Sequence, residues 1–457
     1  MNQLVKTDIT SRSGGLQIVH LAWAAMFCSI LIWGFGEVRA GTIGNTGNWY
    51  RMILVVGAAL LGTHSLFNNG ARIWQAINWP ISLLFVYATV AIISSIFVPD
   101  YAFYSMWKGL EVLVDVIIAM AILSSAKPHE SGWTCYRIYI WLSIALLAIW
   151  WIEAAVIPSE VFLPSRGIIP YTMHGHLPAY NDNTLAFQSA LLSIVFIARY
   201  HRAKGAGTKA VFLAAIAWAL LTLILAQSRT SLLGFLVALS VYLVFNRKFI
   251  FFALIIMIAL IGFLFAGFSQ IAVDYVVRGQ SAELFSSLSG RTIGWNAAWE
   301  LFKESPLFGH GFAAAARTQI LGTGGASTLH GALFDVLVGV GLMGLFPWLG
   351  AITILSWRLY FGAGRIALRS NTIQRSRHAE MLAVLVLVLI RSLTSSGLAM
   401  HDHTFMLFLA VLLYAYSLNS MPSEASIVGS KNKEIKNTDR IIRNRPKVIA
   451  YAKSTRE

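Results

Sequence analysis

Residues 249–268, FIFFALIIMIALIGFLFAGF, decide the class of fold, because this run of twenty residues contains no charged side chain. A helix needs about 20 predominantly apolar residues to cross the hydrocarbon core of a bilayer. The strands of a membrane barrel instead alternate apolar and polar residues over about 10 positions. The run therefore predicts a membrane-spanning α-helix.

The composition of the whole chain agrees with this interpretation. Of 457 residues, 57% are hydrophobic and only 12% are charged, against roughly 25% charged in an average soluble protein. The mean hydropathy is +0.67, and a soluble core of that size would leave too few polar residues to cover its surface. Two cysteines, Cys28 and Cys135, cannot build a disulfide framework or a zinc site. An ordinary soluble domain is excluded.

Apolar runs of spanning length recur along the chain, so we expect an all-α, polytopic transmembrane bundle of about 12 spans. A polar segment at 1–16 precedes the transmembrane domain at 17–418, and a basic tail at 419–457 follows it. We expect this tail to be disordered. The predicted spans are 17–35, 50–67, 78–98, 105–126, 137–157, 185–199, 210–226, 231–245, 249–267, 331–357, 379–397 and 404–418.

The distribution of basic residues predicts the topology. With both termini in the cytoplasm, 25 of the 35 lysines and arginines fall on the cytoplasmic side, as the positive-inside rule requires. The formal charge of +15 is thus explained by topology, and we expect no nucleic-acid partner. Two long loops, at about 158–184 and 268–329, then face the outside, where loops of this length usually carry function.

The second loop contains a helical pattern of its own, SGRTIGWNAAWELFKESPLFGHGF at 289–312. We expect Ile293, Ala297, Trp299 and Leu301 to form its apolar face and Pro306 with Gly309 to end it. Such a helix would lie along the outer membrane surface.

Four of the arginines on the predicted outer side, where the topology depletes positive charge, are candidate site residues. Arg391 stands within the span VLVLIRSLTSS at 386–396, Arg229 in the turn AQSRTS at 226–231, and Arg166 and Arg291 in the two long loops. An ionisable residue at membrane depth is costly unless it is paired or lines a wet cavity. Guanidinium forks suit phosphate oxygens, so the four residues predict a site for a lipid diphosphate. Snorkelling to headgroups, or a contact within a short turn, is the structural alternative.

His330, where the second loop re-enters the membrane, is our candidate general base, because an imidazole of near-neutral pKa can take a proton from a sugar hydroxyl. Without a third spaced carboxylate or cysteine, we expect no metal site at the HGH and HDH sequences. Competing histidines are His174, His176, His310, His401 and His403.

Two carboxylates lie one turn apart in the fourth predicted span, Glu111 and Asp115, and Glu153 lies in the fifth. A pair at this spacing inside a membrane could form a proton relay. It could equally pair with Lys108 or an arginine and hold helices together, and the sequence leaves both interpretations open.

Three blocks of sequence resemble the O-antigen ligase and Wzy-type polysaccharide polymerase superfamily. They are SRT at 228–230, the block at 289–312, and HGALFDVLVGVGLMGLF at 330–346, and the resemblance covers about 160–420. One departure is Gly331, which follows His330 where many members have asparagine.

The resemblance implies a metal-independent glycosyltransferase that needs no cofactor and acts in a bacterial inner membrane. Arg229 and Arg291 would hold the diphosphate of an undecaprenyl-diphosphate-linked glycan donor, and His330 would be the general base. To these we add Arg391 and Arg166 as diphosphate-binding residues.

The acceptor would be a sugar hydroxyl at the periplasmic face. We expect a polymerase of exopolysaccharide or O-antigen biosynthesis. The alternatives are an O-antigen ligase that uses a lipid A-core acceptor and a transporter or lipid-linked glycan flippase. Expected partners are the donor, the glycan or lipid A-core acceptor, membrane lipids, a separate flippase and a chain-length regulator.

Overall fold

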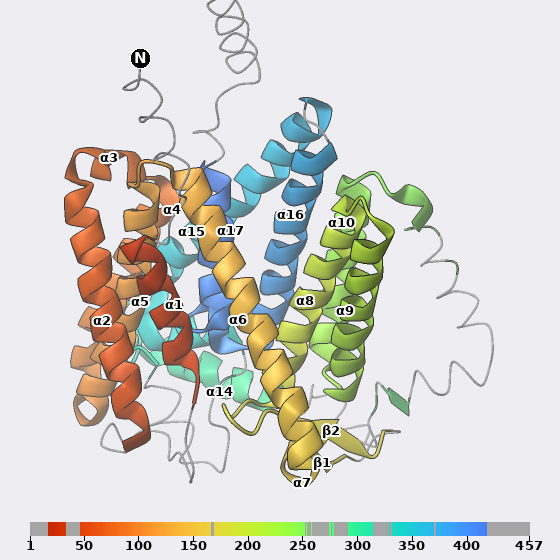
Figure 1. Ribbon diagram of the computed structural model, residues 1–457. Helices are drawn as coiled ribbons and strands as arrows, with labels where there is room; N and C mark the ends of the chain where they lie inside the picture. Colours follow the sequence, from red (N-terminus) through yellow and green to blue (C-terminus); the bar gives the residue numbers. More distant parts are fainter. Residues whose placement is uncertain are drawn as a thin grey trace, which may run out of the picture.

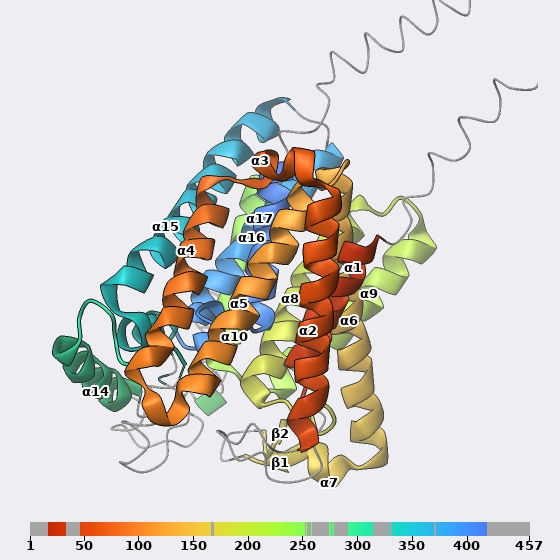
Figure 2. The same cartoon turned by 90° about the vertical axis from the view of Figure 1, so that its left-hand side faces the viewer.

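The computed structural model describes residues 17–32, 46–165, 169–251, 291–313, 331–369 and 372–417, with residues 253, 257, 274, 275, 277 and 329. Segments 1–16 and 419–457, most of the predicted span 249–267 and much of the second loop lie outside this part. Long helices that run side by side dominate what is described (Figures 1 and 2). They are α1 (Ile18–Ile30), α2 (Thr46–Asn68), α4 (Trp79–Ile93), α5 (Ala102–Leu123), α6 (Pro128–Val156), α8 (Asp182–Arg202), α9 (Ala206–Leu225), α10 (Arg229–Phe245), α15 (Ala332–Arg369), α16 (Thr372–Ser392) and α17 (His403–Ser417).

The expected all-α architecture, with helices suited to a membrane, is thereby confirmed, although the count of twelve spans stays a prediction. Within the described residues, five helices are long and apolar enough to cross a bilayer, and three shorter apolar helices accompany them. The five are Trp49–Asn68, Trp79–Phe97, Pro128–Val156, Ala206–Leu225 and Ala332–Gly362.

Helix α17 is buried in the middle of the bundle, since every residue from His403 to Ala415 is buried. A helix that is apolar on all sides belongs in a core or in lipid. Helix α9 is suited to face lipid, because its apolar residues Val211, Leu213 and Leu221 are exposed. These side chains are available to contact lipid tails.

Basic residues that the topology assigns to the cytoplasm lie at one end of the bundle. Arg202 at the end of α8 pairs with Glu380 near the start of α16, with Nη2 and Oε2 2.7 Å apart. Arg358 on α15 donates from Nε to the carbonyl oxygen of Ala415, near the end of α17, at 3.1 Å. The short helix α3 (Ile73–Ala76) lies at this end, opposite α14 (Arg291–Glu304) and α7 (Pro158–Val161) (Figure 1).

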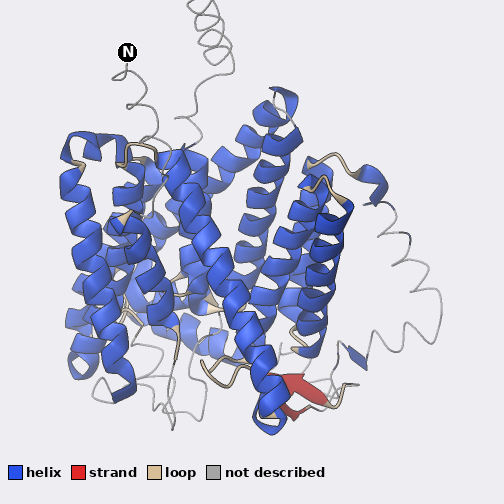
Figure 3. Cartoon of the chain, in the orientation of Figure 1, coloured by secondary structure: helices blue, strands red, loops and turns tan. Residues whose placement is uncertain are grey.

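The first long loop folds into a short antiparallel strand pair, which the sequence did not predict. Strands β1 (Phe162–Pro164) and β2 (Tyr171–Met173) follow α7 and are the strands seen in Figure 3. The Glu153 carboxylate accepts hydrogen bonds from the backbone N–H groups of His176 at 3.2 Å and Leu177 at 2.8 Å. Glu153 therefore holds this loop on the end of α6.

Helix α14 confirms the helix expected in the second loop, but its predicted apolar face is wrong. Ala298 is fully buried, whereas Trp299 is 47% exposed. Trp295 stacks on Phe334 of α15, with ring centroids 5.3 Å apart. The buried face is set by contact with the start of α15, which the spacing of apolar residues alone does not reveal.

The segment after α14 docks on a break in α15. The backbone N–H of His310 donates to the Val338 carbonyl at 2.8 Å, and the N–H of Leu342 donates to the Pro306 carbonyl at 2.9 Å. Gly341 has a left-handed φ of 59° at the break. The opened backbone of α15 is thereby hydrogen-bonded again, as the interior of a membrane protein requires.

Candidate functional site

Ends of α8, α10, α14, α15 and α16 lie at the end of the bundle that carries the strand pair. Ser228, the N-cap of α10, donates from Oγ to Oδ1 of Asn183 in the first turn of α8 at 2.8 Å. Along α10, an added Cβ at Gly234 would lie 3.0 Å from Leu387 of α16, so these helices pack closely. An added Cβ at Gly331, just before α15, would lie 3.5 Å from the Leu393 carbonyl oxygen and 3.3 Å from Trp295 Nε1 of α14.

Three of the predicted arginines stand on these helix ends. Arg229 is the first residue of α10, Arg291 is the first residue of α14, and Arg391 lies in the last turn of α16. Arg229 and Arg291 are half-buried, and Arg391 is only 7% exposed. Arg391 interacts electrostatically with Arg291 and also with two carboxylates, Asp402 and Asp182. The structure thus brings Arg291 and Arg391 into one electrostatic cluster.

Arg391 is held against protein rather than at the surface. Its Cζ lies 6.0 Å from the ring centroid of Phe187 on α8, a distance at which a guanidinium is attracted to an aromatic face. Its burial does not fit a side chain that snorkels to lipid headgroups. The structure therefore favours a paired or ligand-binding cation at this position.

The helix ends add to the positive potential of the arginines. Three helices, α8, α10 and α14, present their N-termini at this end of the bundle, where free N–H groups and the helix dipole favour anions. Burial lowers the pKa of Arg291, whereas the negative charge of Asp182 acts to raise it. An arginine nevertheless stays charged at neutral pH. The arrangement can bind a group that carries two or more negative charges.

Two other predicted site residues, Arg166 and His330, lie outside the described residues, so their roles stay predictions. The residues on either side of position 330 are described. The carbonyl oxygen of Leu329 accepts a hydrogen bond from Trp295 Nε1 of α14 at 3.0 Å. The chain that carries position 330 is therefore joined to the helix that begins with Arg291.

Sequence reasoning missed the polar residues that hold this end together. Gln227 has a left-handed φ of 50° and is buried. Its side-chain amide donates to the carbonyl oxygens of Ile169 at 3.2 Å and Tyr171 at 2.8 Å. Gln227 thus joins the turn before α10 to the strand pair. Its position two residues before Arg229 is the feature of the sequence that could have pointed to it.

Two of the competing histidines, His310 and His176, contact other groups of the protein. His310 contacts the Leu301 carbonyl through Nε2 at 2.8 Å, and His176 Nδ1 lies 4.0 Å from Glu160 Oε2. Within the part of the chain that the structure describes, no three His, Cys, Asp or Glu side chains gather as they would around a metal ion. HGH and HDH do not assemble such a group there.

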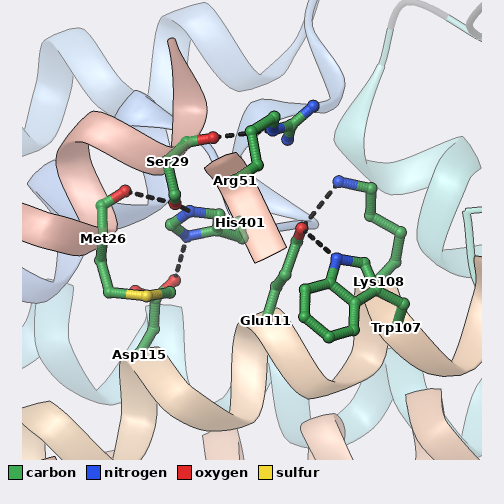
Figure 4. A network of polar contacts seen from close by, with 8 residues as sticks. All are labelled: Met26, Ser29, Arg51, Trp107, Lys108, Glu111, Asp115 and His401. Carbon is green, nitrogen blue, oxygen red and sulfur yellow. Dashed lines mark hydrogen bonds and ion pairs between the residues drawn. The ribbon is translucent and has the colours of Figure 1, made fainter. Parts of the chain in front are cut away.

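A second polar cluster lies among α1, α2 and α5 (Figure 4). Glu111 accepts hydrogen bonds from Lys108 Nζ and Trp107 Nε1, each at 2.7 Å. The expected pairing of Glu111 with Lys108 is therefore confirmed. Because both residues lie on α5, this contact does not join two helices.

Asp115 has a more distant partner. Its Oδ2 lies 2.7 Å from His401 Nδ1, and His401 Nε2 lies 2.9 Å from Ser29 Oγ. Figure 4 shows this chain of contacts from α1 through His401 to α5. Asp115 and His401 fix the segment that leads into α17, and Asp402 is the next residue along it.

Comparison with known families adds the last observation. Residues 212–349 match the O-antigen ligase family model. The matched segment includes Arg229, Arg291 and His330, and the match confirms the resemblance found in the sequence blocks. Arg166 and Arg391 lie outside the matched residues. No curated protein matches the chain. The match supports a membrane protein with a glycan-transferring function of the ligase or polymerase type.

Proposed function

We propose that this protein is a glycan polymerase. It transfers an undecaprenyl-diphosphate-linked oligosaccharide or polysaccharide to an acceptor sugar hydroxyl at the periplasmic face, in exopolysaccharide or O-antigen biosynthesis. The observation that carries the proposal is the cluster at one end of the bundle, where buried Arg391 interacts with Arg291 and the N-terminus of α10, with Arg229, is joined to α8. The O-antigen ligase match supports it.

The proposed reaction is a single displacement with inversion. The acceptor oxygen forms a bond to the anomeric carbon of the donor while the bond from that carbon to the diphosphate oxygen breaks. The electron pair of the broken bond leaves with undecaprenyl diphosphate, and the acceptor proton passes to His330. The balance of atoms requires no further reactant.

Arginines supply the charge stabilisation in this scheme. Negative charge grows on the departing diphosphate, and preorganised cations in a site of low dielectric stabilise it more than water does. Arg229, Arg291 and Arg391 would contact the diphosphate, and Arg166 would approach it from the first loop. Because three or four guanidinium groups can provide this stabilisation, the proposed step is metal-independent.

An O-antigen ligase is the second candidate, and the family description favours it directly. Both enzymes would use the same donor and site but different acceptors, a glycan for the polymerase and lipid A-core for the ligase. A strain that lacks this gene separates them. Loss of a polymerase leaves single repeat units on the lipid carrier, whereas loss of a ligase leaves long unattached chains.

The transporter alternative has less support. Glu111, one of the two carboxylates that suggested a proton relay, is paired with Lys108 on its own helix. Glycan transfer by purified protein in lipid, with undecaprenyl-diphosphate-linked donor and acceptor and with chelator present, tests the proposal. Absence of any transfer would instead favour a transporter or flippase.

The proposal also requires an orientation. The end with α14 faces the periplasm, and both termini face the cytoplasm of a bacterial inner membrane. Alkaline phosphatase fused after Gly290 should be active, and fusions after Gly364 or Ser430 should be inactive. An inactive fusion at 290 would invert the topology and remove the site from the side on which the donor is presented.

A further inference from the structure

After α16 the chain turns back into the bundle before α17 begins. Residues 393–402 start at Leu393, whose side chain is 68% exposed, and run through the buried turn Ser396–Leu398 to His401, which is also buried. We call residues 393–402 the re-entrant segment. Because non-helical backbone inside a membrane bundle finds no hydrogen-bond partner in lipid, protein groups have to supply the partners.

Two neighbouring helices supply such partners with their side chains. Trp348 of α15 donates from Nε1 to the Leu398 carbonyl oxygen at 3.0 Å. Tyr87 of α4 donates from its hydroxyl to the Ala399 carbonyl oxygen. These two bonds hold the middle of the re-entrant segment at a fixed depth.

His401 anchors the deep end of the re-entrant segment. Its Nδ1 lies 2.7 Å from Oδ2 of Asp115 on α5, and its Nε2 lies 2.9 Å from Oγ of Ser29 on α1 (Figure 4). The Ser29 hydroxyl has one proton and donates it to the Met26 carbonyl oxygen at 2.7 Å, so it accepts the hydrogen bond from Nε2. One further proton lies between Nδ1 and the Asp115 carboxylate. Both ring nitrogens are therefore bonded, and the imidazole is fixed between two helices.

The other end of the re-entrant segment lies at the candidate site. Leu393 follows Arg391 by two residues, and the N–H of Thr394 donates to the Arg391 carbonyl oxygen at 3.1 Å. The Leu393 carbonyl oxygen lies 3.5 Å from the place of an added Cβ on Gly331, just before α15. The re-entrant segment thus runs from the last turn of α16, which carries Arg391, to the bonds of His401.

We propose that His401 is a positioning residue for glycan transfer. Bonded to Asp115 and Ser29, it fixes the re-entrant segment, and through that segment it sets the place of Arg391 at the diphosphate. This inference rests on the proposed function. It also gives the Asp115 carboxylate a role other than a proton relay, because Asp115 serves as the hydrogen-bond partner that holds His401.

Two substitutions of Asp115 separate positioning from proton transfer. In Asp115→Asn the amide can donate to His401 Nδ1 while Nε2 stays bonded to Ser29, but an amide cannot pass on a proton. In Asp115→Leu the branched shape is kept and the hydrogen bond is lost. We expect Asp115→Asn to keep kcat/KM for the lipid-linked donor close to that of the wild type. Asp115→Leu should lower it by at least about tenfold, since a misplacement of about 1 Å can cost about 100-fold.

His401 itself is a poorer target for substitution. Its removal would leave the Asp115 carboxylate buried without a partner, which destabilises a protein strongly. The two Asp115 variants avoid this problem, because neither of them carries a buried charge at position 115.

Combination with Arg391→Lys tests whether the effect passes through Arg391. Residues that act as a unit have effects that do not multiply. The loss of kcat/KM in the double variant Asp115→Leu with Arg391→Lys should therefore fall clearly short of the product of the two single losses. A loss equal to that product would show independent action and would overturn the inference.

Tyr136→Phe is the matched control. It removes a hydrogen bond of 2.9 Å from the Tyr136 hydroxyl to Oε1 of Glu380, a buried carboxylate on α16 at the opposite end of the bundle. This variant should keep the kcat/KM of the wild type. Thermal unfolding in detergent and the amount of folded protein are measured for each variant, so that activities are compared per folded molecule.

The remaining outcomes are equally distinct. If folded Asp115→Leu has the kcat/KM of the wild type, His401 only stabilises the fold and the inference is overturned. If Asp115→Asn loses as much activity as Asp115→Leu, Asp115 has to exchange a proton and the relay interpretation replaces positioning. An equal loss in Tyr136→Phe would reduce the effect to a general disturbance of the bundle. Failure of the proposed function differs from all of these, because the wild-type protein itself would transfer no glycan.

Discussion

Replacement of Arg391 by lysine should reduce glycan transfer strongly while the protein still folds. Lysine keeps the positive charge but loses the planar fork that can hold two phosphate oxygens. Each charge-assisted hydrogen bond contributes roughly 1.5–3 kcal/mol, and a factor of ten in rate corresponds to about 1.4 kcal/mol. We therefore expect kcat/KM for the lipid-linked donor to fall by about 10- to 100-fold.

The structure supplies a matched control for this substitution. Arg358 also lies over an aromatic ring, with Cζ 4.0 Å from the Tyr416 centroid, but it lies on α15 at the opposite end of the bundle. Arg358→Lys loses a similar contact without touching the proposed site, so its kcat/KM should stay near that of the wild type.

The assay is glycan transfer by purified protein in lipid, with the amount of membrane protein measured for each variant. Equal activity of Arg391→Lys and wild type would refute the reasoning. Arg391 would then be a buried cation that needs only its charge, balanced by Asp402 and Asp182, and the diphosphate would bind elsewhere.

Three further predictions follow from the same geometry. Arg229→Lys and Arg291→Lys should each lower transfer by about 10- to 100-fold at normal protein level, and full activity of both would leave them as headgroup anchors. His330→Gln should lower transfer by roughly 10²- to 10⁴-fold without loss of donor binding, and robust turnover would retire the general base. Gly309→Ala should lower the thermal unfolding temperature, because φ at Gly309 is +69° and a Cβ there would lie 2.6 Å from the Gly339 carbonyl carbon. Gly57→Ala, with nothing within 4 Å of the added Cβ, is its control, and equal unfolding temperatures would contradict the role given to Gly309.

The helical membrane class and the position of α14 could be predicted because both depend on local sequence. A run of apolar residues of spanning length has few other stable structures, and capping or breaking residues limit a helix wherever it lies. The arginines stood out for a related reason. A charge in an otherwise apolar span, such as Arg391, is visible without knowledge of its neighbours.

Features that depend on distant residues could not be predicted in this way. The contact between Asp115 and His401 joins residues 286 positions apart, and neither residue has a pattern that points to the other. The three-residue strands β1 and β2 are too short to show alternation. Asp182 resembled an ordinary helix-start residue, since acidic side chains are common there, and its electrostatic interaction with Arg291 and Arg391 depends on the fold.

The break in α15 explains how a long loop can hold an arginine in a fixed place. An unbroken helix would use its carbonyl and N–H groups internally, and the segment after α14 would have no backbone partner. Around Gly341 these groups are free to bond with residues 306–311. Main-chain bonds of this kind do not depend on side-chain rotamers, so they fix α14 more firmly than side-chain contacts alone. Arg291 begins the helix fixed in this way, and a catalytic arrangement loses activity when its groups are misplaced by as little as 1 Å. In the proposed function, the glycines of the GHGF sequence at 309–312 therefore serve the site by fixing the helix that carries Arg291.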